Sequence, residues 1–236
     1  METSVTAHPR SFRMLRKFFI GSFVAVLTLV GCSGVQRDRS HGPAVSGPGC
    51  CRSVEATASR TAIVRSATKL VGARTIEVNG HRIAYDCAGV TRAVFLEHGI
   101  DLYQSRTTDQ KANGVRLIYN HIRDHGKFHH GPAARPGDLV FFDNTWDSNG
   151  DGRMNDPLTH VGIVEKQERD GTITFISRVA GAVERYRMNL GLPHVYRTGD
   201  GRILNDHIRR KDAGSASETG YLTGELFAGF GSRTGL

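Results

Sequence analysis

A cysteine and a histidine stand where a thiol nucleophile and its base could work. Cys87 follows Tyr85 and Asp86 and begins a segment, 87–98, whose apolar residues recur at helical spacing. His160 begins a short apolar run that predicts a strand. A sulfur at the start of a helix lies at the positive end of the helix dipole, and an imidazole can take its proton. The pair therefore predicts thiolate attack on a carbonyl carbon, with backbone N–H groups available to stabilise the oxyanion.

Each residue also has a purely structural interpretation. An unpaired cysteine often behaves as a small buried apolar residue, and a histidine at the end of a strand is often hydrogen-bonded within the core. Of the four cysteines, Cys32 precedes the predicted domain, and the adjacent Cys50 and Cys51 could pair with each other only under strain. Cys87 is therefore not part of an obvious disulfide, and its thiol is free for chemistry.

In the elements that must position this pair, the spacing of apolar residues changes along the chain from helical to strand-like. Apolar residues repeat at helical spacing over 57–71, 87–98 and 113–125. Short apolar or alternating runs predict strands over 139–142, 161–166, 172–177 and 183–188. Helices followed by an antiparallel sheet are typical of an α+β domain.

Three further segments complete this prediction. Asn79 and Gly80 predict a tight hairpin turn within 75–84. Glycines and a proline frame residues 127–130, for which we expect a solvated loop. Residues 197–220 predict irregular surface, and residues 221–230 predict a return to the sheet.

Three segments together resemble the NlpC-type cell-wall cysteine peptidases and the related CHAP amidase/peptidase domains. They are Tyr85-Asp86-Cys87-Ala88-Gly89, Pro136-Gly137-Asp138-Leu139-Val140-Phe141-Phe142 and Thr159-His160-Val161-Gly162-Ile163-Val164. Their order and spacing are similar to those of the family over roughly residues 60–190. The resemblance implies a papain-like domain over 57–236, with its motif core over 75–190 and N-terminal helices packed on an antiparallel sheet.

The resemblance also implies roles for individual residues. Cys87 is similar to the nucleophile of the family and His160 to its base, which implies a cysteine peptidase or amidase that cleaves amide bonds of peptidoglycan. Tyr85 and Asp86 match residues that contact the substrate. Ser177 falls where the family places the polar group that orients the histidine.

The chain departs from the family pattern at two positions. Ala88 replaces a serine that often helps to hold the free amino group of the substrate, and Ser177 replaces a histidine, asparagine or glutamine. A hydroxyl can accept an Nδ1–H hydrogen bond but holds the ring less firmly than a carboxylate or an amide. Two alternatives therefore stay open. One is a catalytically weak or inactive module that binds wall peptides or an envelope partner, and the other is acyl transfer or thiol-dependent hydrolysis of another substrate.

A calcium-type loop precedes the histidine. Its candidate ligands follow the spacing of an EF-hand loop and are Asp147, Asn149, Asp151, the carbonyl of Arg153, and Asn155. The twelfth position, where a bidentate glutamate belongs, is Leu158, so Asp156 or Asp143 would have to complete the set. The loop predicts a structural Ca²⁺ ion, with a metal-free polar turn as the alternative, and we expect no cofactor for the catalysis itself.

The first 32 residues predict a lipoprotein signal peptide. Basic residues between positions 10 and 17 precede an apolar run over 18–30, which is too short to span a bilayer comfortably. The run ends in Leu29-Val30-Gly31-Cys32, a lipobox in which Cys32 receives the lipid; an uncleaved anchor helix is the alternative. Residues 33–56 predict a flexible tether. We therefore expect an exported bacterial lipoprotein of the cell envelope, anchored to a membrane and facing the periplasm or the cell surface.

The charge of the chain is mildly basic. Its 31 Lys and Arg residues against 23 Asp and Glu residues give a net charge of +8, and 27 basic and 22 acidic residues remain without residues 1–31. This excess suits anionic wall polymers or lipid headgroups, and it equally suits ordinary solubility. The basic residues are scattered among acidic ones without an aromatic-lined stripe, so we do not expect nucleic acid as a partner. The family resemblance implies peptidoglycan peptides as the partner.

Overall fold

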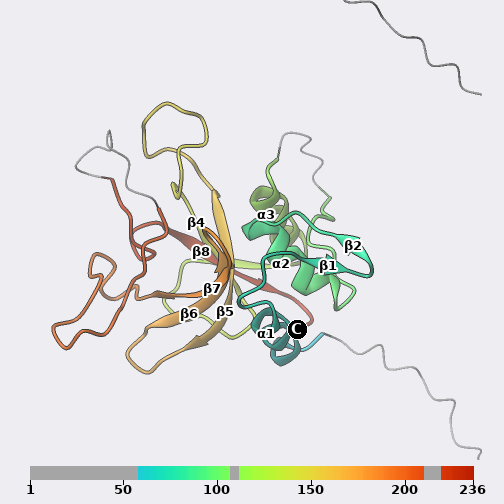
Figure 1. The fold of residues 1–236 in the computed structure, drawn as a ribbon, viewed down its shortest axis with the longest axis horizontal. Coiled ribbons are helices and arrows are strands. Elements are labelled where there is room, and N and C mark those ends of the chain that lie inside the picture. Colours follow the sequence, from blue (N-terminus) through green and yellow to red (C-terminus); the bar gives the residue numbers. More distant parts are fainter. Residues whose placement is uncertain (1–57, 107–111, 210–218) are drawn as a thin grey trace, which may run out of the picture. The chain divides into compact units, whose positions relative to one another are not determined.

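The chain forms an α+β domain in which three helices cover one face of a six-stranded antiparallel sheet (Figure 1). The computed structural model describes residues 58–106, 112–209 and 219–236. All of these belong to the second of the two compact units, Met1–Cys50 and Cys51–Leu236, into which the chain divides. The predicted α+β class is confirmed. The predicted signal peptide and tether lie outside the described residues.

Each helix begins beside a side chain that caps its first backbone N–H groups. The helices are α1, Arg60–Lys69, α2, Cys87–Leu96, and α3, Gly114–His125. Ser59, Asp86 and Asn113 precede them, and each side-chain oxygen accepts a hydrogen bond from the backbone N–H three residues further on. The three helices that the apolar spacing predicts are confirmed.

The strands of the main sheet lie in the order β3-β8-β4-β5-β6-β7. They are β3, Gly126–His129, β4, Leu139–Phe142, β5, His160–Gln167, β6, Ile173–Arg178, β7, Val183–Met188, and β8, Phe227–Arg233. The four strands predicted between residues 139 and 188 are confirmed, and β8 is the return to the sheet that the sequence predicts near the end of the chain.

A separate two-stranded hairpin precedes α2. It pairs β1, Glu77–Val78, with β2, His81–Arg82. Its turn residues Asn79 and Gly80 take positive φ angles of 52° and 75°, as a type I′ turn requires. The predicted hairpin is confirmed.

The predicted loop over 127–130 is wrong, because most of it belongs to strand β3. This strand pairs antiparallel with β8, which arrives from a distant part of the sequence and supplies the partner backbone. Phe128 then packs edge-on against Tyr119, with 5.0 Å between the ring centroids. Gly229 makes room for it, since a Cβ there would lie 2.2 Å from the Phe128 ring. The flanking glycines and proline suggested a loop, but tertiary pairing decides the conformation.

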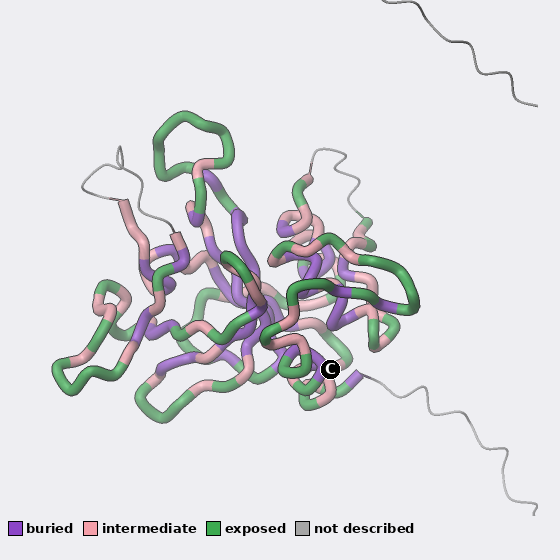
Figure 2. The backbone as a smooth tube through the Cα atoms, viewed as in Figure 1, coloured by how far each residue is buried: buried purple, intermediate pink, exposed green. Residues whose placement is uncertain are grey.

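Side chains that alternate along the strands form two cores, one on each face of the sheet. The helix-side core joins residues of all three helices to Phe141 and Val161. The opposite core contains Phe142 and Phe175 and, among the described residues, no side chain from a helix. Figure 2 shows the buried backbone concentrated in the strands and the adjoining helices.

Asp138 ties three distant parts of this fold together. The side chain is 1% exposed and accepts hydrogen bonds from the Arg60 guanidinium and the Ser232 hydroxyl, both at 2.6 Å, and from the Arg135 N–H at 2.8 Å. A buried carboxylate is stable only with such partners. The Pro-Gly-Asp segment therefore fixes the beginning of β4 to α1 and to β8.

Candidate catalytic site at the beginning of strand β5

Cys87 is the first residue of α2, where the sequence predicts it. Asp86 caps the helix by accepting a hydrogen bond from the Gly89 N–H at 2.7 Å. Only glycine fits at position 89, because a Cβ there would lie 1.8 Å from the carbonyl oxygen of Ala84. Cys87 is half-buried and its thiol is free. The local sequence thus places an unpaired sulfur at a helix N-terminus, as nucleophilic chemistry requires.

His160 is the first residue of β5 and pairs across the sheet with Phe142. Its ring is buried, and Nε2 lies 2.9 Å from Ser177 Oγ. Ser177 donates its own proton to the carbonyl oxygen of Val161 at 2.7 Å, so the network assigns the donated proton of the first bond to Nε2. Nδ1 is then the nitrogen that can take a proton. Ser177 contacts the ring as the sequence leads us to expect, but through Nε2 rather than Nδ1.

Cys87 and His160 reach the beginning of β5 from different sides of the sheet. The thiol packs against the helix-side core and lies within hydrogen-bonding reach of the Val161 backbone N–H. The imidazole lies beside Phe142 of the opposite core, with 6.1 Å between the ring centroids. Across the described ranges of the chain, no hydrogen bond joins the sulfur to the ring. The helix residue Cys87 and the strand residue His160 therefore both lie near the beginning of β5 but do not form an ion pair.

Burial keeps both groups uncharged at neutral pH. It raises the pKa of the Cys87 thiol to about 11, an effect that the Val161 N–H opposes and the Asp86 carboxylate reinforces. Burial also lowers the pKa of His160 to about 3, and the Arg178 guanidinium acts in the same direction. The sequence-based expectation of a thiolate favoured by the helix dipole is therefore wrong for this conformation, because desolvation outweighs the helix terminus.

The residues predicted to contact a substrate are also engaged within the protein. Tyr85 Oη donates a hydrogen bond to the carbonyl oxygen of Ala73, and the Arg178 guanidinium lies 5.0 Å from the centroid of its ring. Asp86 caps α2. Ala88 is 3% exposed, so the side chain that departs from the family pattern points into the core. Substrate contact by Tyr85 and Asp86 stays a prediction.

Tyr103 is a residue of this site that the sequence does not single out. A Cβ added at Gly114 would lie 2.5 Å from Tyr103 Oη and 2.7 Å from Ala88 Cβ, so the phenol and the alanine flank the same point. Burial raises the pKa of Tyr103, and the nearby Asp86 and Cys87 add to the effect. The phenol therefore remains a hydrogen-bond donor. Tyr103 lies outside the three motifs, and no spacing rule points to it.

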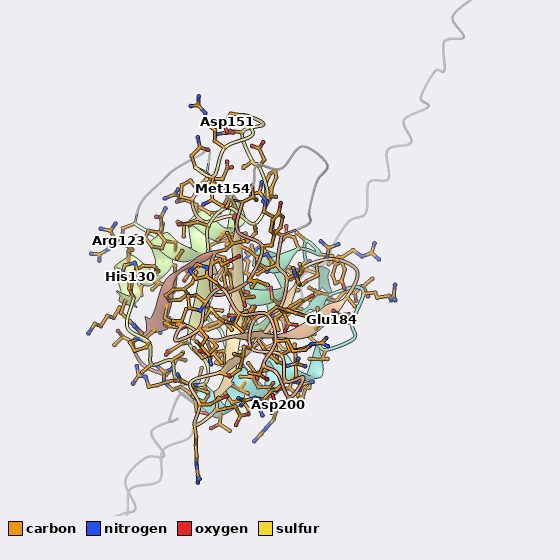
Figure 3. The ribbon with its side chains drawn as sticks, turned by 90° about the vertical axis from the view of Figure 1, so that its left-hand side faces the viewer. Arg123, His130, Asp151, Met154, Glu184 and Asp200 are labelled. Atoms are coloured by element: carbon orange, nitrogen blue, oxygen red, sulfur yellow. The ribbon has the colours of Figure 1, made fainter. Side chains whose placement is uncertain are left out.

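The calcium-type loop projects from the sheet between β4 and β5 (Figure 3). Asp147 accepts hydrogen bonds from the backbone N–H groups of two loop glycines, at 2.7 and 2.8 Å. Asp151 accepts one from the Arg153 N–H at 2.9 Å, and the side chains of Asn149 and Asn155 bond each other at 3.1 Å. These bonds fold the loop through its own backbone and amide groups.

The ligand set for a Ca²⁺ ion is only partly matched. Leu158, at the twelfth position, is buried with a positive φ of 55°. Asp156 is 4% exposed, and its Oδ2 has no hydrogen-bond partner within the described residues. Asp143 Oδ1 already accepts a hydrogen bond from the Leu158 N–H at 2.7 Å. Among the residues that the structure describes, no group of three or more His, Cys, Asp or Glu side chains could hold a metal ion. Calcium stays a prediction.

The predicted lipid attachment lies outside the described residues, as do Cys32, Cys50 and Cys51. Within the described residues, no helix is both long and apolar enough to cross a membrane.

Comparison with known proteins gives a weak structural likeness and no match by sequence. No protein-family model matches the chain, and no curated protein matches it. Among solved structures, it is similar to the crystal structure of the P60 domain from the M. avium subspecies paratuberculosis antigen MAP1204, with 15% sequence identity and a TM-score of 0.31. The match covers 53% of this chain and 82% of that one. Likeness at this level shows neither a family nor an activity for the present chain.

Proposed function

We propose that this protein is a cysteine hydrolase with a papain-like arrangement of catalytic residues, which cleaves amide bonds within peptidoglycan peptides or between peptide and glycan. The observation that carries the proposal is that both groups lie near the beginning of β5, although they approach it from different sides of the sheet. There the Cys87 thiol meets the Val161 N–H, and His160 is hydrogen-bonded to Ser177 at 2.9 Å. A nucleophile at a helix start, a base at a strand start and a polar group on the next strand are the parts that this reaction needs.

In the proposed reaction, Cys87 Sγ attacks the carbonyl carbon of the amide while His160 Nδ1 takes the thiol proton. Backbone N–H groups at the start of α2 stabilise the oxyanion. Cleavage of the C–N bond returns that proton to the leaving amine and leaves an acyl-thioester on Cys87. Water that gives its proton to His160 then releases the acid and regenerates the thiol. Since the resting groups are uncharged and lie on different sides of the sheet, the beginning of β5 that carries His160 must rearrange before the ring can reach the sulfur, which predicts slow turnover.

We propose that the protein works at the bacterial cell envelope as an exported lipoprotein. The support is the apolar run over 18–30 followed by a lipobox ending at Cys32. Metabolic labelling of a bacterial host with a clickable fatty acid tests this. We expect the wild type to be labelled and Cys32→Ser to remain unlabelled. Equal labelling of both would rule out lipid attachment at Cys32.

The hydrolase is tested by digestion of purified peptidoglycan with the full chain, followed by mass spectrometry of the soluble fragments. Wild type and Cys50→Ala should release fragments, and Cys87→Ala should release none. Cys50→Ala is the matched control, because it removes a thiol from the predicted tether. Equal release by Cys87→Ala would remove the enzymatic claim.

A module that binds wall peptides without cleaving them is the second candidate. It is favoured by the pKa of Cys87, raised to about 11 by burial, and by the pKa of His160, lowered to about 3 by burial. Co-sedimentation with peptidoglycan without released fragments, at equal levels for wild type and Cys87→Ala, would support it.

A further inference from the structure

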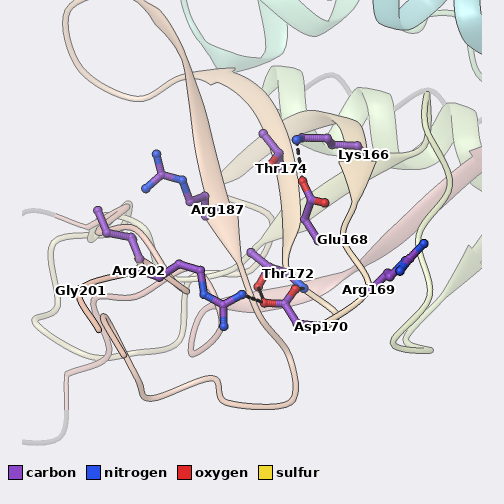
Figure 4. Close-up of a pocket in the computed structure, with 10 residues that line it drawn as sticks. Lys166, Glu168, Arg169, Asp170, Thr172, Thr174, Arg187, Gly201 and Arg202 are labelled. Carbon is purple, nitrogen blue, oxygen red and sulfur yellow. Dashed lines mark hydrogen bonds and ion pairs between the residues drawn. The ribbon is translucent and has the colours of Figure 1, made fainter. Parts of the chain in front are cut away.

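A cavity of about 790 Å³ opens at the end of the β5–β6 hairpin that is opposite to His160 (Figure 4). Its lining comes from β5, the turn over 168–172, β6, β7 and residues 201–203. This volume is within the usual range for sites of small ligands. None of the residues assigned to the proposed hydrolysis lines it, so the cavity is separate from that site.

Three neighbouring strands place a row of polar side chains in this cavity. Lys166 of β5 pairs with Thr174 of β6, and Thr174 pairs with Arg187 of β7. Partners in antiparallel strands project from the same face of a sheet. The backbone of Arg187 is fixed from its other side, because its N–H donates to Asp206 Oδ2 at 2.7 Å and its carbonyl accepts from the Asp206 N–H at 3.0 Å. Arg187 therefore extends from a rigid strand.

The charges in this lining do not balance. Two ion pairs account for both acidic residues and two of the basic ones: Lys166 with Glu168 at 2.5 Å, and Arg202 with Asp170. Arg187 and Arg169 also line the cavity, and neither has an ion-pair partner within the described parts of the chain. The four basic and two acidic residues of the lining thus sum to a net charge of +2, and Figure 4 shows Arg187 and Arg169 at different ends of the lining.

We propose that this cavity binds a phosphate group that carries close to two negative charges, either inorganic phosphate or a phosphate monoester. Such a group carries about −1.5 to −2 charges at neutral pH, which matches the net charge of the lining. The planar guanidinium of Arg187 suits two phosphate oxygens at once, and the Thr174 hydroxyl beside it adds a neutral donor. Carboxylate and phosphodiester ligands carry a single charge and leave part of the excess uncompensated.

The test is a calorimetric titration of the full chain with inorganic phosphate at low ionic strength, compared with chloride at equal ionic strength. We expect saturable binding of phosphate by wild type and about a tenfold weaker affinity for Arg187→Gln, the loss typical of one charge-assisted hydrogen bond. Arg185→Gln is the matched control: it removes the same charge from the same strand, but this arginine pairs with Glu165 and does not line the cavity. Its affinity should equal that of wild type.

Two further arms identify the source of the group and keep the test independent of folding. Vesicles with phosphatidic acid should bind wild type better than Arg187→Gln if a lipid monoester is the ligand, whereas binding of free phosphate alone points to a soluble ligand. If Arg187→Gln fails to fold, Arg187→Lys keeps the charge and should still weaken binding, since lysine offers no planar pair of donors. The proposal is overturned if phosphate binds no better than chloride, or if Arg185→Gln weakens it as much as Arg187→Gln.

Discussion

The two ends of the β5–β6 hairpin hold ionisable groups in opposite states. At the beginning of β5, His160 and Ser177 are buried, and burial holds the pKa of the imidazole near 3, so the ring is neutral. At the other end, Lys166 of β5 and Arg187 of the adjacent β7 are exposed and charged, and of these two only Lys166 has an ion-pair partner within the described residues. The same pair of strands thus carries a desolvated site that must acquire charge during a reaction and a solvated site whose charge is permanent.

The largest expected effect separates the two ends by their activities. His160→Ala should lower the rate of peptidoglycan hydrolysis about a thousandfold, since general acid–base catalysis typically contributes 10² to 10⁴. Its affinity for inorganic phosphate should stay that of wild type, because the cavity is at the other end of the hairpin. Fragment release and calorimetry on the same preparation measure both. A parallel loss of both activities would mean that the ends are coupled.

The next effect concerns the reactivity of the buried thiol. Because burial raises the pKa of Cys87 from about 9 to about 11, its alkylation by iodoacetamide at pH 7 should be about a hundredfold slower than that of an unperturbed thiol. The rate should rise with pH up to about 11. Replacing Cys32, Cys50 and Cys51 by serine leaves one thiol to follow by mass spectrometry. A rate that is already at its plateau at pH 7 would show that this end of the hairpin holds a thiolate.

Acid should weaken the fold through the buried ring. The pKa of His160 is lowered from 6.5 to about 3, so between these values the unfolded chain binds a proton that the folded chain does not. Its contribution to stability is complete above about pH 6.5 and is lost as the pH falls toward 3, with a slope of up to about 1.4 kcal/mol per pH unit. Denaturant unfolding at several pH values should show a flatter profile for His160→Gln. Identical profiles for the two proteins would mean that the ring already titrates normally.

Removing one hydroxyl from each end of β6 should have unequal effects. Ser177→Ala leaves the buried Nε2–H of His160 without its acceptor, which should lower the free energy of unfolding by about 1–3 kcal/mol. Thr174→Ala at the cavity end should change it by no more than about 0.5 kcal/mol. Chemical denaturation of both variants gives the comparison. Equal losses would contradict the difference in desolvation between the two ends.

The smallest expected effect tests the calcium-type loop. Trp146, the single tryptophan of the chain, is 54% exposed and immediately precedes Asp147. If the loop binds a cation, excitation of Trp146 should sensitise Tb³⁺ emission, and Ca²⁺ should compete for the site. Asp147→Asn should lose the signal, whereas Asp200→Asn, an exposed acid elsewhere, should keep it. Equal emission from both variants would indicate non-specific binding.

Local sequence was sufficient where short-range chemistry decides the structure. The start of α2 at Cys87 follows from Asp86 as a cap and from Gly89, which avoids the Ala84 carbonyl. The turn at Asn79 and Gly80 follows in the same way from the φ angles that these residues tolerate. The hydroxyl of Ser177 was also placed correctly beside His160, because both lie on adjacent strands of one hairpin.

Properties that depend on distant partners could not be predicted from the sequence. Strand β3 needs β8 beside it, and this pairing leaves no trace in the residues of β3 themselves. The pKa of Cys87 depends on how much protein surrounds the sulfur, which overrides the local dipole of α2. Tyr103 comes to the site through the packing of α2 on Gly114, and the cavity at the hairpin turn joins segments that have no common motif.

The place of β8 in the sheet sets the order in which this protein can fold. Five of the six strands of the sheet precede β8 in the chain, yet β3 and β4 do not pair with each other and are joined only through β8. Asp138 likewise lacks one of its hydrogen-bond donors until β8, which contains Ser232, is in place. A chain that ends before Phe227 therefore leaves one edge of β4 unpaired, β3 without a partner strand, and the Asp138 carboxylate without the hydrogen bond from Ser232. The sheet is therefore complete only when β8 pairs with both β3 and β4, so the last strand in sequence joins segments that have no other contact within the sheet.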